Sequence, residues 1–283
     1  MVNFKNLRDY GFNTNSRTFI IAEIGINHNG SLRQAEKMIS AAARAGVDAV
    51  KFQTYITEKR THKDSPIFDI LKSCELTNED FIQLKIHATS CGVEFFSTPF
   101  DEESVDFLES ISCNLYKVAS FDITNLKLIS RIAQTDKPVV MSTGMSSIEE
   151  IKAAVNTVIE SDNTNIALLH CVSAYPTSEK DANLSKIFSL EDTFKNICVI
   201  GQSDHTNDII VPLYAVAAGA QIIEKHFMLD GSTCPDSPVS IDQFQMTKLV
   251  EETRRLEAIF GHGEFGVVNA ELGTLQYRRK SYV

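Results

Sequence analysis

The sequence predicts a single domain folded as an α/β protein, a (β/α)8 TIM barrel. A short apolar run, then turn-forming Gly, Ser, Thr, Asn or Pro, then a segment with helical spacing recurs eight times along the 283 residues. The apolar runs are continuous, which indicates strands buried on both faces, as in a parallel sheet covered by helices. Eight such units close a barrel, and no G-x-G-x-x-G segment follows the first strand to favour an open, doubly wound sheet.

The expected strands are short and rich in β-branched or aromatic residues. In chain order they are Thr18–Gly25, Ala49–Gln53, Glu94–Ser97, Leu115–Ala119, Pro138–Ser142, Asn165–His170, Cys198–Gln202 and Gln221–His226. Amphipathic helices are expected between them, and two have clear ends. The first ends before Gly46, and another begins at Ser146 with Glu149 three residues later, a capping-box spacing. Their apolar stripes are expected to face the sheet.

Three segments lie outside the regular pattern. We expect residues 1–17 to be an N-terminal extension that forms a small hairpin or plug, residues 18–262 to be the catalytic barrel, and residues 263–283 to be a C-terminal linker or an unpartnered strand. The connection over residues 54–77 is long, and its apolar residues indicate a short lid helix; they are Ile67, Phe68, Ile70 and Leu71. Long connections at this end of a barrel often carry function.

Composition narrows the class of protein. Apolar residues make up 43% of the chain, and 27 Lys and Arg against 37 Asp and Glu give a net charge of −10 with no basic run. Nucleic acid and anionic membranes are therefore not expected partners. The six cysteines lack C-x-x-C spacing, and neither a signal peptide nor a membrane-length apolar run is present, which together predict a cytoplasmic protein with reduced cysteines.

Two histidines follow neighbouring predicted strands and form a candidate metal site. His205 stands in G-Q-S-D-H-T and His226 in I-I-E-K-H-F, so both side chains are expected at the carboxyl ends of strands seven and eight. Neighbouring strands are about 4.8 Å apart, and imidazole binds a divalent ion at about 2.0–2.3 Å, so one ion can reach both. Such an open site admits Mn, Fe, Co or Zn. The alternative is two separately packed histidines, and His170 is expected to be a packed, hydrogen-bonded residue.

Charged residues inside other strands indicate an anion site. Glu23 interrupts the first strand, and Lys51 and Lys117 interrupt the second and fourth. Two lysines in an acidic barrel suit a carboxylate or phosphate ligand. The alternative is pairing of these lysines with Glu23, Asp122 or Glu224, and the two interpretations are compatible.

Hydroxyl groups and a glycine at two further strand ends suggest an anion cradle. The third strand leads to Ser97 and Thr98, and the fifth leads to Ser142, Thr143 and Gly144. Backbone N–H groups ahead of a helix bind anions, although the same residues serve equally as helix caps.

Eight segments together resemble the catalytic barrel of the sialic acid synthase family, which includes N-acetylneuraminate, legionaminate and pseudaminate synthases and spore-coat polysaccharide proteins. They are F-I-I-A-E-I-G-I-N-H-N-G, D-A-V-K-F-Q-T-Y, F-F-S-T-P-F, Y-K-V-A-S, V-V-M-S-T-G-M, A-L-L-H-C-V-S-A-Y-P-T, G-Q-S-D-H-T and I-I-E-K-H-F-M-L-D. The similarity runs in order over residues 15–283.

The resemblance implies a transferase that condenses phosphoenolpyruvate with the open-chain aldehyde of an N-acetylated hexosamine, giving a nine-carbon 2-keto-3-deoxy sugar acid and phosphate. It implies a homodimer and a Mn²⁺ or Mg²⁺ ion on His205 and His226. It assigns the phosphoenolpyruvate site to Lys51, Thr98, Lys117, Ser120, Ser142, Ser173 and Ser203. It places Glu23, Tyr175 and Asp236 at the sugar, and Asp122 near the attacking water, for which Asp122 or Glu23 is the candidate proton acceptor.

The sequence does not decide the role of a C-terminal domain, the acceptor sugar or between three functions. Full-length family members continue into an antifreeze-like domain that supplies an arginine to the partner subunit's site, whereas this chain ends at R-R-K-S-Y-V. E-K-H-F-M-L-D resembles pseudaminate synthases and A-E-I-G-I-N-H-N-G resembles the other synthases, so the sugar is undecided. A Schiff-base aldolase using Lys51 or Lys117 and a catalytically silent polysaccharide-assembly subunit are the alternative functions.

Overall fold

Eight parallel strands form a closed barrel in sequence order in the computed structural model, which describes residues 17–194, 196–261 and 263–279. The strands are β1 (Phe19–Gly25), β2 (Ala49–Thr54), β3 (Glu94–Pro99), β4 (Tyr116–Val118), β5 (Val139–Ser142), β6 (Ile166–Cys171), β7 (Cys198–Asp204) and β8 (Ile222–His226). Pairing of β8 with β1 closes the ring. The predicted (β/α)8 barrel is confirmed.

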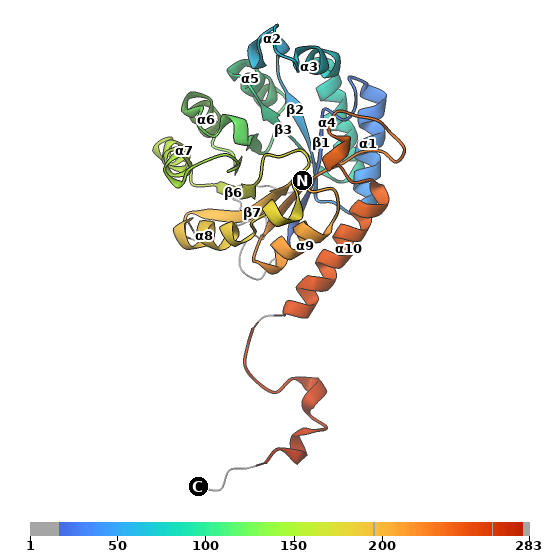
Figure 1. The fold of residues 1–283 in the computed structure, drawn as a ribbon, viewed down its shortest axis with the longest axis vertical. Coiled ribbons are helices and arrows are strands. Elements are labelled where there is room, and N and C mark those ends of the chain that lie inside the picture. Colours follow the sequence, from blue (N-terminus) through green and yellow to red (C-terminus); the bar gives the residue numbers. More distant parts are fainter. Residues whose placement is uncertain (1–16, 195, 262, 280–283) are drawn as a thin grey trace.

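Helices surround the ring of strands (Figure 1). They are α1 (Leu32–Ala45), α2 (Thr57–Arg60), α3 (Phe68–Cys74), α4 (Asn78–Cys91), α5 (Glu102–Ser110), α6 (Leu126–Ala133), α7 (Ile148–Glu160), α8 (Ser185–Phe194), α9 (Ile210–Ala217) and α10 (Gln243–Phe260). Both α2 and α3 lie in the long connection between β2 and α4. Helix α3 confirms the short helix that the apolar residues of this connection predict.

Helix ends follow local capping rules. Gly46 ends α1 with a φ of 87°, a left-handed conformation that glycine adopts without strain. The predicted start of α7 at Ser146 is wrong by one residue. The side chain of Ser147 accepts a hydrogen bond from the backbone N–H of Glu150, and the carboxylate of Glu150 accepts one from the backbone N–H of Ser147. Ser146 instead donates to the carbonyl of Gly144 at 3.1 Å, so it belongs to the preceding turn.

Alternation along each strand decides which side chains face the barrel axis. On β2, Phe52 points outward, stacks on Phe95 at 5.5 Å between ring centroids and meets the edge of Phe81 of α4 at 6.4 Å. All three rings are buried, and burying one such side chain stabilises the fold by about 1.5–3 kcal/mol. Because successive side chains on a strand point to opposite faces, Lys51 and Gln53 are directed inward.

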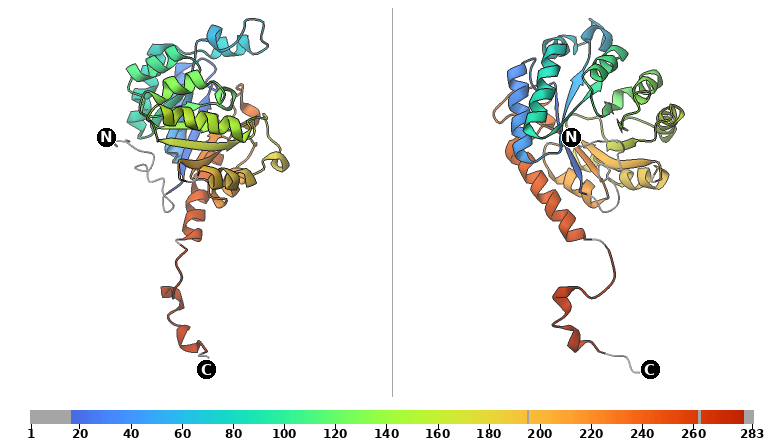
Figure 2. Two further views of the ribbon diagram at one scale, coloured as in Figure 1. Left: turned by 90° about the vertical axis from the view of Figure 1, so that its left-hand side faces the viewer. Right: turned by 180° about the vertical axis from the view of Figure 1, so that it is seen from behind.

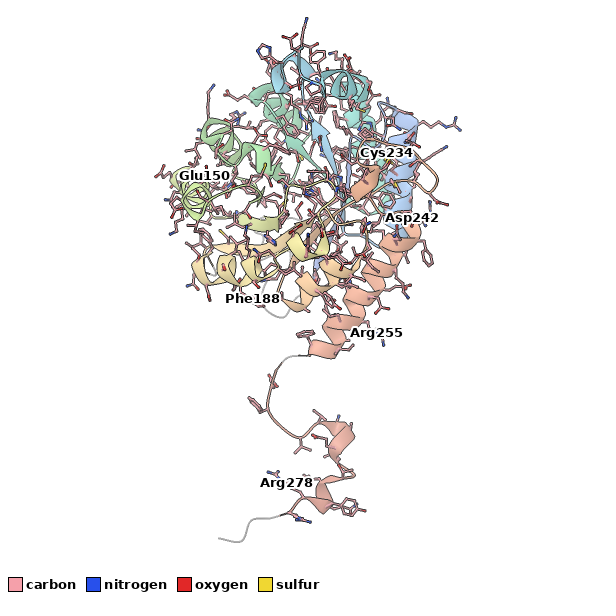
Figure 3. All side chains as sticks on the ribbon, viewed as in Figure 1. Glu150, Phe188, Cys234, Asp242, Arg255 and Arg278 are labelled. Carbon is pink, nitrogen blue, oxygen red and sulfur yellow. The ribbon has the colours of Figure 1, made fainter. Side chains whose placement is uncertain are left out.

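The ends of the chain stand apart from this architecture. The predicted plug over residues 1–17 lies almost wholly outside the described residues. Residues 263–279 leave the barrel after α10 (Figures 1 and 2) and contain two single-turn 3-10 helices, Asn269–Glu271 and Leu275–Tyr277. Figure 3 shows Arg278 on this segment, away from the barrel. The described part of the segment holds no strand and has exposed side chains, as a linker would.

The structure also bears on the cysteines and on the predicted lack of a membrane-spanning segment. All six cysteines are free thiols. Among the described residues, no helix combines the length and the apolar character needed to cross a bilayer.

A buried ion pair joins the outer faces of β7 and β8 and allows a test of the fold. Lys225 Nζ lies 2.8 Å from Asp204 Oδ2, and both side chains are almost fully buried. We expect Lys225→Met to lower the free energy of unfolding by about 3–5 kcal/mol, because Asp204 is left as a buried charge without its cation. Urea unfolding measures this difference.

The double variant Lys225→Met/Asp204→Asn is the matched control for this pair. It removes both charges, so it should recover much of the lost stability. A double variant as unstable as the single one would show that the ion pair is not what stabilises this part of the barrel.

Candidate functional site

A cavity of about 320 Å³ opens at the carboxyl ends of the strands, and residues from all eight strands line it. The strand residues are Glu23, Lys51, Gln53, Thr98, Lys117, Ser142, Cys171, Ser203, Glu224 and His226, and His205 follows β7 directly. Connections supply the rim, which includes Arg60, Ile67, Ile70, Leu71, Phe100, Ser120, Phe121, Tyr175 and Asp236. The barrel therefore brings most of the predicted site residues together.

A chain of four buried charges forms the floor of the cavity. Lys51 Nζ lies 2.7 Å from Glu23 Oε2 and 3.7 Å from Glu224 Oε2. Lys117 Nζ lies 3.6 Å from Glu224 Oε1. Two ammonium groups thus face two carboxylates, and the predicted pairing of the lysines with Glu23 and Glu224 is observed. Asp122, the third predicted partner, takes part in neither pair.

The pKa values of these groups follow from burial and from their neighbours. Burial alone would raise the pKa of Glu224, but Lys117, Lys51 and a hydrogen bond from Ser203 lower it overall. Burial would lower the pKa of Lys51, but Glu224 and Glu23 raise it overall. Burial also lowers the pKa of Lys117, and Glu224 offsets this only in part. Lys51 therefore keeps its charge more firmly than Lys117 does.

Hydroxyl groups accompany both lysines. Lys51 Nζ donates to Thr98 Oγ1 at 3.0 Å, and Lys117 Nζ donates to Ser142 Oγ at 2.6 Å. Each ammonium group is therefore held by a short side chain from the next strand, with its position fixed before any ligand arrives.

A cradle of two hydroxyls and a glycine lies in the turns that follow β4, β5 and β6, with Ser120, Gly144 and Ser173. The backbone N–H of Gly144 donates to Ser120 Oγ at 3.0 Å. A Cβ at Gly144 would lie 2.3 Å from Ser173 Oγ and 2.8 Å from Ser120 Oγ, so no larger residue fits. Ser173 Oγ is buried and has no hydrogen-bond partner among the described residues. A buried hydroxyl left unpaired is costly unless a ligand pairs with it, which suits the anion cradle predicted here.

The two predicted metal-ligating histidines converge on the cavity. Their ring centroids are 5.2 Å apart, with the rings tilted by 56°. His205 Nδ1 lies 2.7 Å from the carbonyl oxygen of Val172, so this nitrogen carries the proton and Nε2 keeps a free lone pair. His226 Nδ1 is buried and makes no hydrogen bond of normal geometry among the described residues, although a carboxylate oxygen of Asp236 lies 3.4 Å from it.

Three residues hold the histidines and the adjacent loop in place. Tyr175 stacks on His205 at 4.2 Å between ring centroids and meets His226 edge-on at 5.9 Å. Asp236 Oδ2 lies 3.4 Å from His226 Nδ1. The side chain of Asn27 accepts from the backbone N–H of Asp236 and donates to the carbonyl of Phe227. Asn27 therefore fixes the position of the loop that carries Asp236.

The donor set suits an open cation site. Over the described ranges, no group of three or more His, Cys, Asp and Glu side chains is arranged to hold a metal ion. His205 and His226 offer two imidazole nitrogen donors, and they fit an ion whose remaining positions are taken by water and substrate.

Two predicted site residues, Asp122 and Ser173, are not among the residues that line the cavity, and His170 also lies outside it. Asp122 sits on the 3-10 helix Ser120–Asp122, is not among the residues that line the cavity, and has Asn125 as its hydrogen-bond partner at 3.5 Å. His170 points outward from β6, and its Nε2 lies 2.7 Å from the carbonyl oxygen of Ala182. The packed, hydrogen-bonded position expected for His170 is observed.

Four polar cavity residues were not among the predicted site residues. Gln53 and Glu224 stand two positions from Lys51 and His226 on the same strands, so period-two alternation could have found them. Cys171 stands in an apolar segment, as the other cysteines do, so its sequence context does not mark it as a cavity residue. Arg60 lies on a short helix within a connection, where strand periodicity gives no signal.

Residues 38–265 match the NeuB family. The chain belongs to this family. Its resemblance to sialic acid synthases, which rests on eight short segments, is thereby confirmed over most of the sequence.

Named relatives of this NeuB family member are sugar acid synthases. The N,N'-diacetyllegionaminic acid synthase of Legionella pneumophila is 40% identical over 265 residues, which cover 87% of this chain and 74% of that protein. The pseudaminic acid synthase of Campylobacter jejuni is 35% identical over 286 residues, covering 96% and 83%. The N-acetylneuraminic acid synthetase structure from Leptospira borgpetersenii, determined with citrate, is 39% identical, covers 93% and 92%, and superposes with a TM-score of 0.89.

Gly144 provides a test of the cradle. In Gly144→Ala the new methyl group would displace the hydroxyls of Ser173 and Ser120. For phosphoenolpyruvate, the ligand that the family resemblance implies, we expect the Kd to rise about tenfold to hundredfold, because one or two charge-assisted hydrogen bonds are lost. Isothermal titration calorimetry measures this affinity.

Gly92 offers a matched control for this substitution. A Cβ at Gly92 would meet no atom within 4 Å, and its φ of 75° is left-handed, unlike that of Gly144, so Gly92→Ala tests the cost of replacing a glycine away from the cradle. Unchanged affinity in Gly144→Ala, or an equal loss in both variants, would contradict a cradle at Gly144.

Proposed function

We propose that this protein condenses phosphoenolpyruvate with the open-chain aldehyde of an N-acetylated hexosamine, releasing phosphate and forming a nine-carbon 2-keto-3-deoxy sugar acid. C3 of phosphoenolpyruvate forms a bond to the aldehyde carbon, a water molecule adds at C2, and the C2–phosphate bond is broken. The observation that carries the proposal is one cavity lined by two lysines, by serine hydroxyls and by two histidines; they are Lys51, Lys117, Ser120, Ser142, Ser203, His205 and His226.

The lysine side of the cavity suits phosphoenolpyruvate. Lys51 and Lys117 offer ammonium groups to its carboxylate and phosphate, and Ser120, Ser142 and Ser173 offer hydroxyls. Because Glu23 and Glu224 already balance the lysines, the lysines stay buried and fixed without a ligand. Groups oriented in advance stabilise the departing phosphate without reorganising during the reaction. We assign Thr98 and Ser203 to the same site, through their bonds to Lys51 and Glu224.

The histidine side suits the acceptor aldehyde. His205 and His226 would hold a Mn²⁺ or Mg²⁺ ion, which when bound supplies Lewis-acid polarisation of the aldehyde oxygen. Tyr175 fixes the ring of His205, and its position beside the histidines supports a role in orienting the sugar. Asp236 is held in the same region by Asn27 and His226, where it can accept hydrogen bonds from sugar hydroxyls.

Glu23 is the better supported proton acceptor for the attacking water. It lines the cavity, and its two oxygens contact Lys51 and Gln53. Asp122 is not a lining residue, although burial raises its pKa. Geometry takes precedence over pKa in such an assignment, because a base has to reach the proton that it removes.

Release of phosphate tests donor, acceptor and metal together. We expect the protein to release phosphate from phosphoenolpyruvate only with an N-acetylated hexosamine and Mn²⁺ or Mg²⁺, and to lose this activity after chelation. We expect His226→Gln to lower kcat by about a hundredfold or more, because one of two protein ligands is lost. His62→Gln, an exposed histidine outside the cavity, is the control. Full turnover after chelation, or no phosphate release with any acceptor in the panel, would contradict the proposal.

One observation favours the Schiff-base alternative, namely the lowered pKa of Lys117. An aldolase using this lysine would act on pyruvate without releasing phosphate and would not need a metal ion. A silent assembly subunit would bind neither phosphoenolpyruvate nor metal. Phosphate release therefore separates the synthase from both alternatives, and borohydride trapping with a carbonyl substrate identifies the aldolase.

Lys117 also gives the reaction a pH dependence. Burial lowers its pKa below the ordinary 10.5, so its positive charge is complete at low pH and is lost as the pH rises through the lowered value. We expect the KM for phosphoenolpyruvate to rise on the alkaline side before pH 10.5. Lys117→Arg should remove this rise, since a guanidinium group stays protonated throughout this pH range. The same alkaline rise in the arginine variant would assign it to another group.

A further inference from the structure

Arg60, at the end of α2, is held rigidly at the rim of the cavity. Its guanidinium carbon lies 3.6 Å from the centroid of the Phe100 ring and 4.6 Å from that of Tyr55. Its Nη1 donates to Gln53 Oε1 at 2.9 Å. Stacking on two rings together with a hydrogen bond leaves an arginine little rotational freedom, so the direction of its remaining N–H groups is set.

The guanidinium lacks an ion-pair partner in the described part of the chain. No Asp or Glu oxygen lies within 4.0 Å of it there, whereas Lys59, its neighbour in sequence, pairs with Glu103. Lys72 of α3 pairs with Glu58 and Glu75. Arg60 is half-buried and lines the cavity, so its unused donors are available to a ligand.

Hydrogen bonds connect Arg60 with the floor of the cavity. Gln53 accepts from Arg60 through Oε1, and its Nε2 donates to Glu23 Oε1 at 3.2 Å. Glu23 in turn contacts Lys51. The side-chain amide of Gln53 therefore fixes the position of Arg60, and of a ligand bound to it, relative to Glu23 at the floor.

The wall around Arg60 is apolar. Ile67, Ile70 and Leu71 from α3 and the residue before it line the same cavity, with Phe121. Ile67, Ile70 and Phe121 expose 49%, 46% and 65% of their surface. One guanidinium beside aliphatic and aromatic side chains suits a group with a carbonyl oxygen and a methyl group better than it suits a phosphate, which favours several donors and solvent.

We propose that Arg60 and this apolar wall recognise the N-acyl group of the acceptor, with Arg60 donating to the acyl oxygen and the wall packing on the acyl methyl group. This inference rests on the proposed function and assigns its acceptor specificity to residues of α2 and α3. Arg60 is a specificity-determining residue rather than a catalytic one, because it contacts the acyl group and not the reacting atoms.

Steady-state kinetics on two acceptors test this assignment. We expect Arg60→Met to raise the KM for an N-acetylated hexosamine about tenfold to hundredfold, with kcat and the KM for phosphoenolpyruvate unchanged. The matching hexose, with a hydroxyl in place of the acetamido group, should be used equally by variant and wild type. Arg60→Lys should be intermediate, because it keeps the charge without the planar donors. Lys59→Met, on the same helix but outside the cavity, is the matched control.

Several outcomes would overturn the assignment. An equal rise in KM for both acceptors, a rise in the KM for phosphoenolpyruvate, or an effect confined to a hexosamine 6-phosphate would each place Arg60 at another group. Thermal unfolding of the variants checks that each one is folded. If Arg60→Met does not fold, the same measurements are made on Arg60→Lys.

Failure of the proposed function is a separate result. If the wild type releases no phosphate with any acceptor, saturation-transfer NMR on the acetyl methyl protons of an N-acetylated hexosamine still tests Arg60. Transfer in the wild type that is lost in Arg60→Met supports acyl recognition. No transfer in the wild type, or equal transfer in both proteins, overturns it.

Discussion

The buried chain of charges from Glu23 through Lys51 and Glu224 to Lys117 is the constraint on which the rest of the site depends. Desolvating four ions costs several kcal/mol for each, and that cost is met only if each charge has its partner at short range. The strands must therefore hold a fixed register. The same four groups keep the end of the barrel polar, so a cavity with oriented ammonium groups replaces an apolar core there.

Floor and rim of the cavity have different structural origins. Floor residues such as Lys117 and Glu224 sit on strands, whose positions are set by the closed ring of hydrogen bonds. Rim residues such as Arg60 and Ile67 sit on connections, which vary without disturbing the barrel. The names of the relatives refer to different sugar acids, and a rim carried by connections is a part of the cavity that can change while the strands stay in place.

The sequence was most informative where periodicity determines structure. Continuous apolar runs located the strands, and parallel pairing then required His205 and His226 to emerge together, as they do. Capping residues predicted the start of α7 less reliably. Ser146 and Ser147 are both acceptable N-caps, and only the turn around Gly144 decides between them. Arg60 could not be found, since its place depends on how α2 packs against Phe100. Asp122 lies just beyond the cavity for the same reason, being on a turn whose path the strand pattern does not determine.

The contacts of Asn27 indicate when the cavity forms during folding. Its side chain connects the turn after β1 with Phe227, Ser240 and Asp236, residues about two hundred positions later in the chain. Contacts at such separation form late, because a long loop must be closed first. The first and last strands therefore meet at the seam where Asp236 and His226 are brought beside Glu23. A nascent or partly opened chain has no complete pocket, so ligand binding at this site reports that the ring of strands has closed.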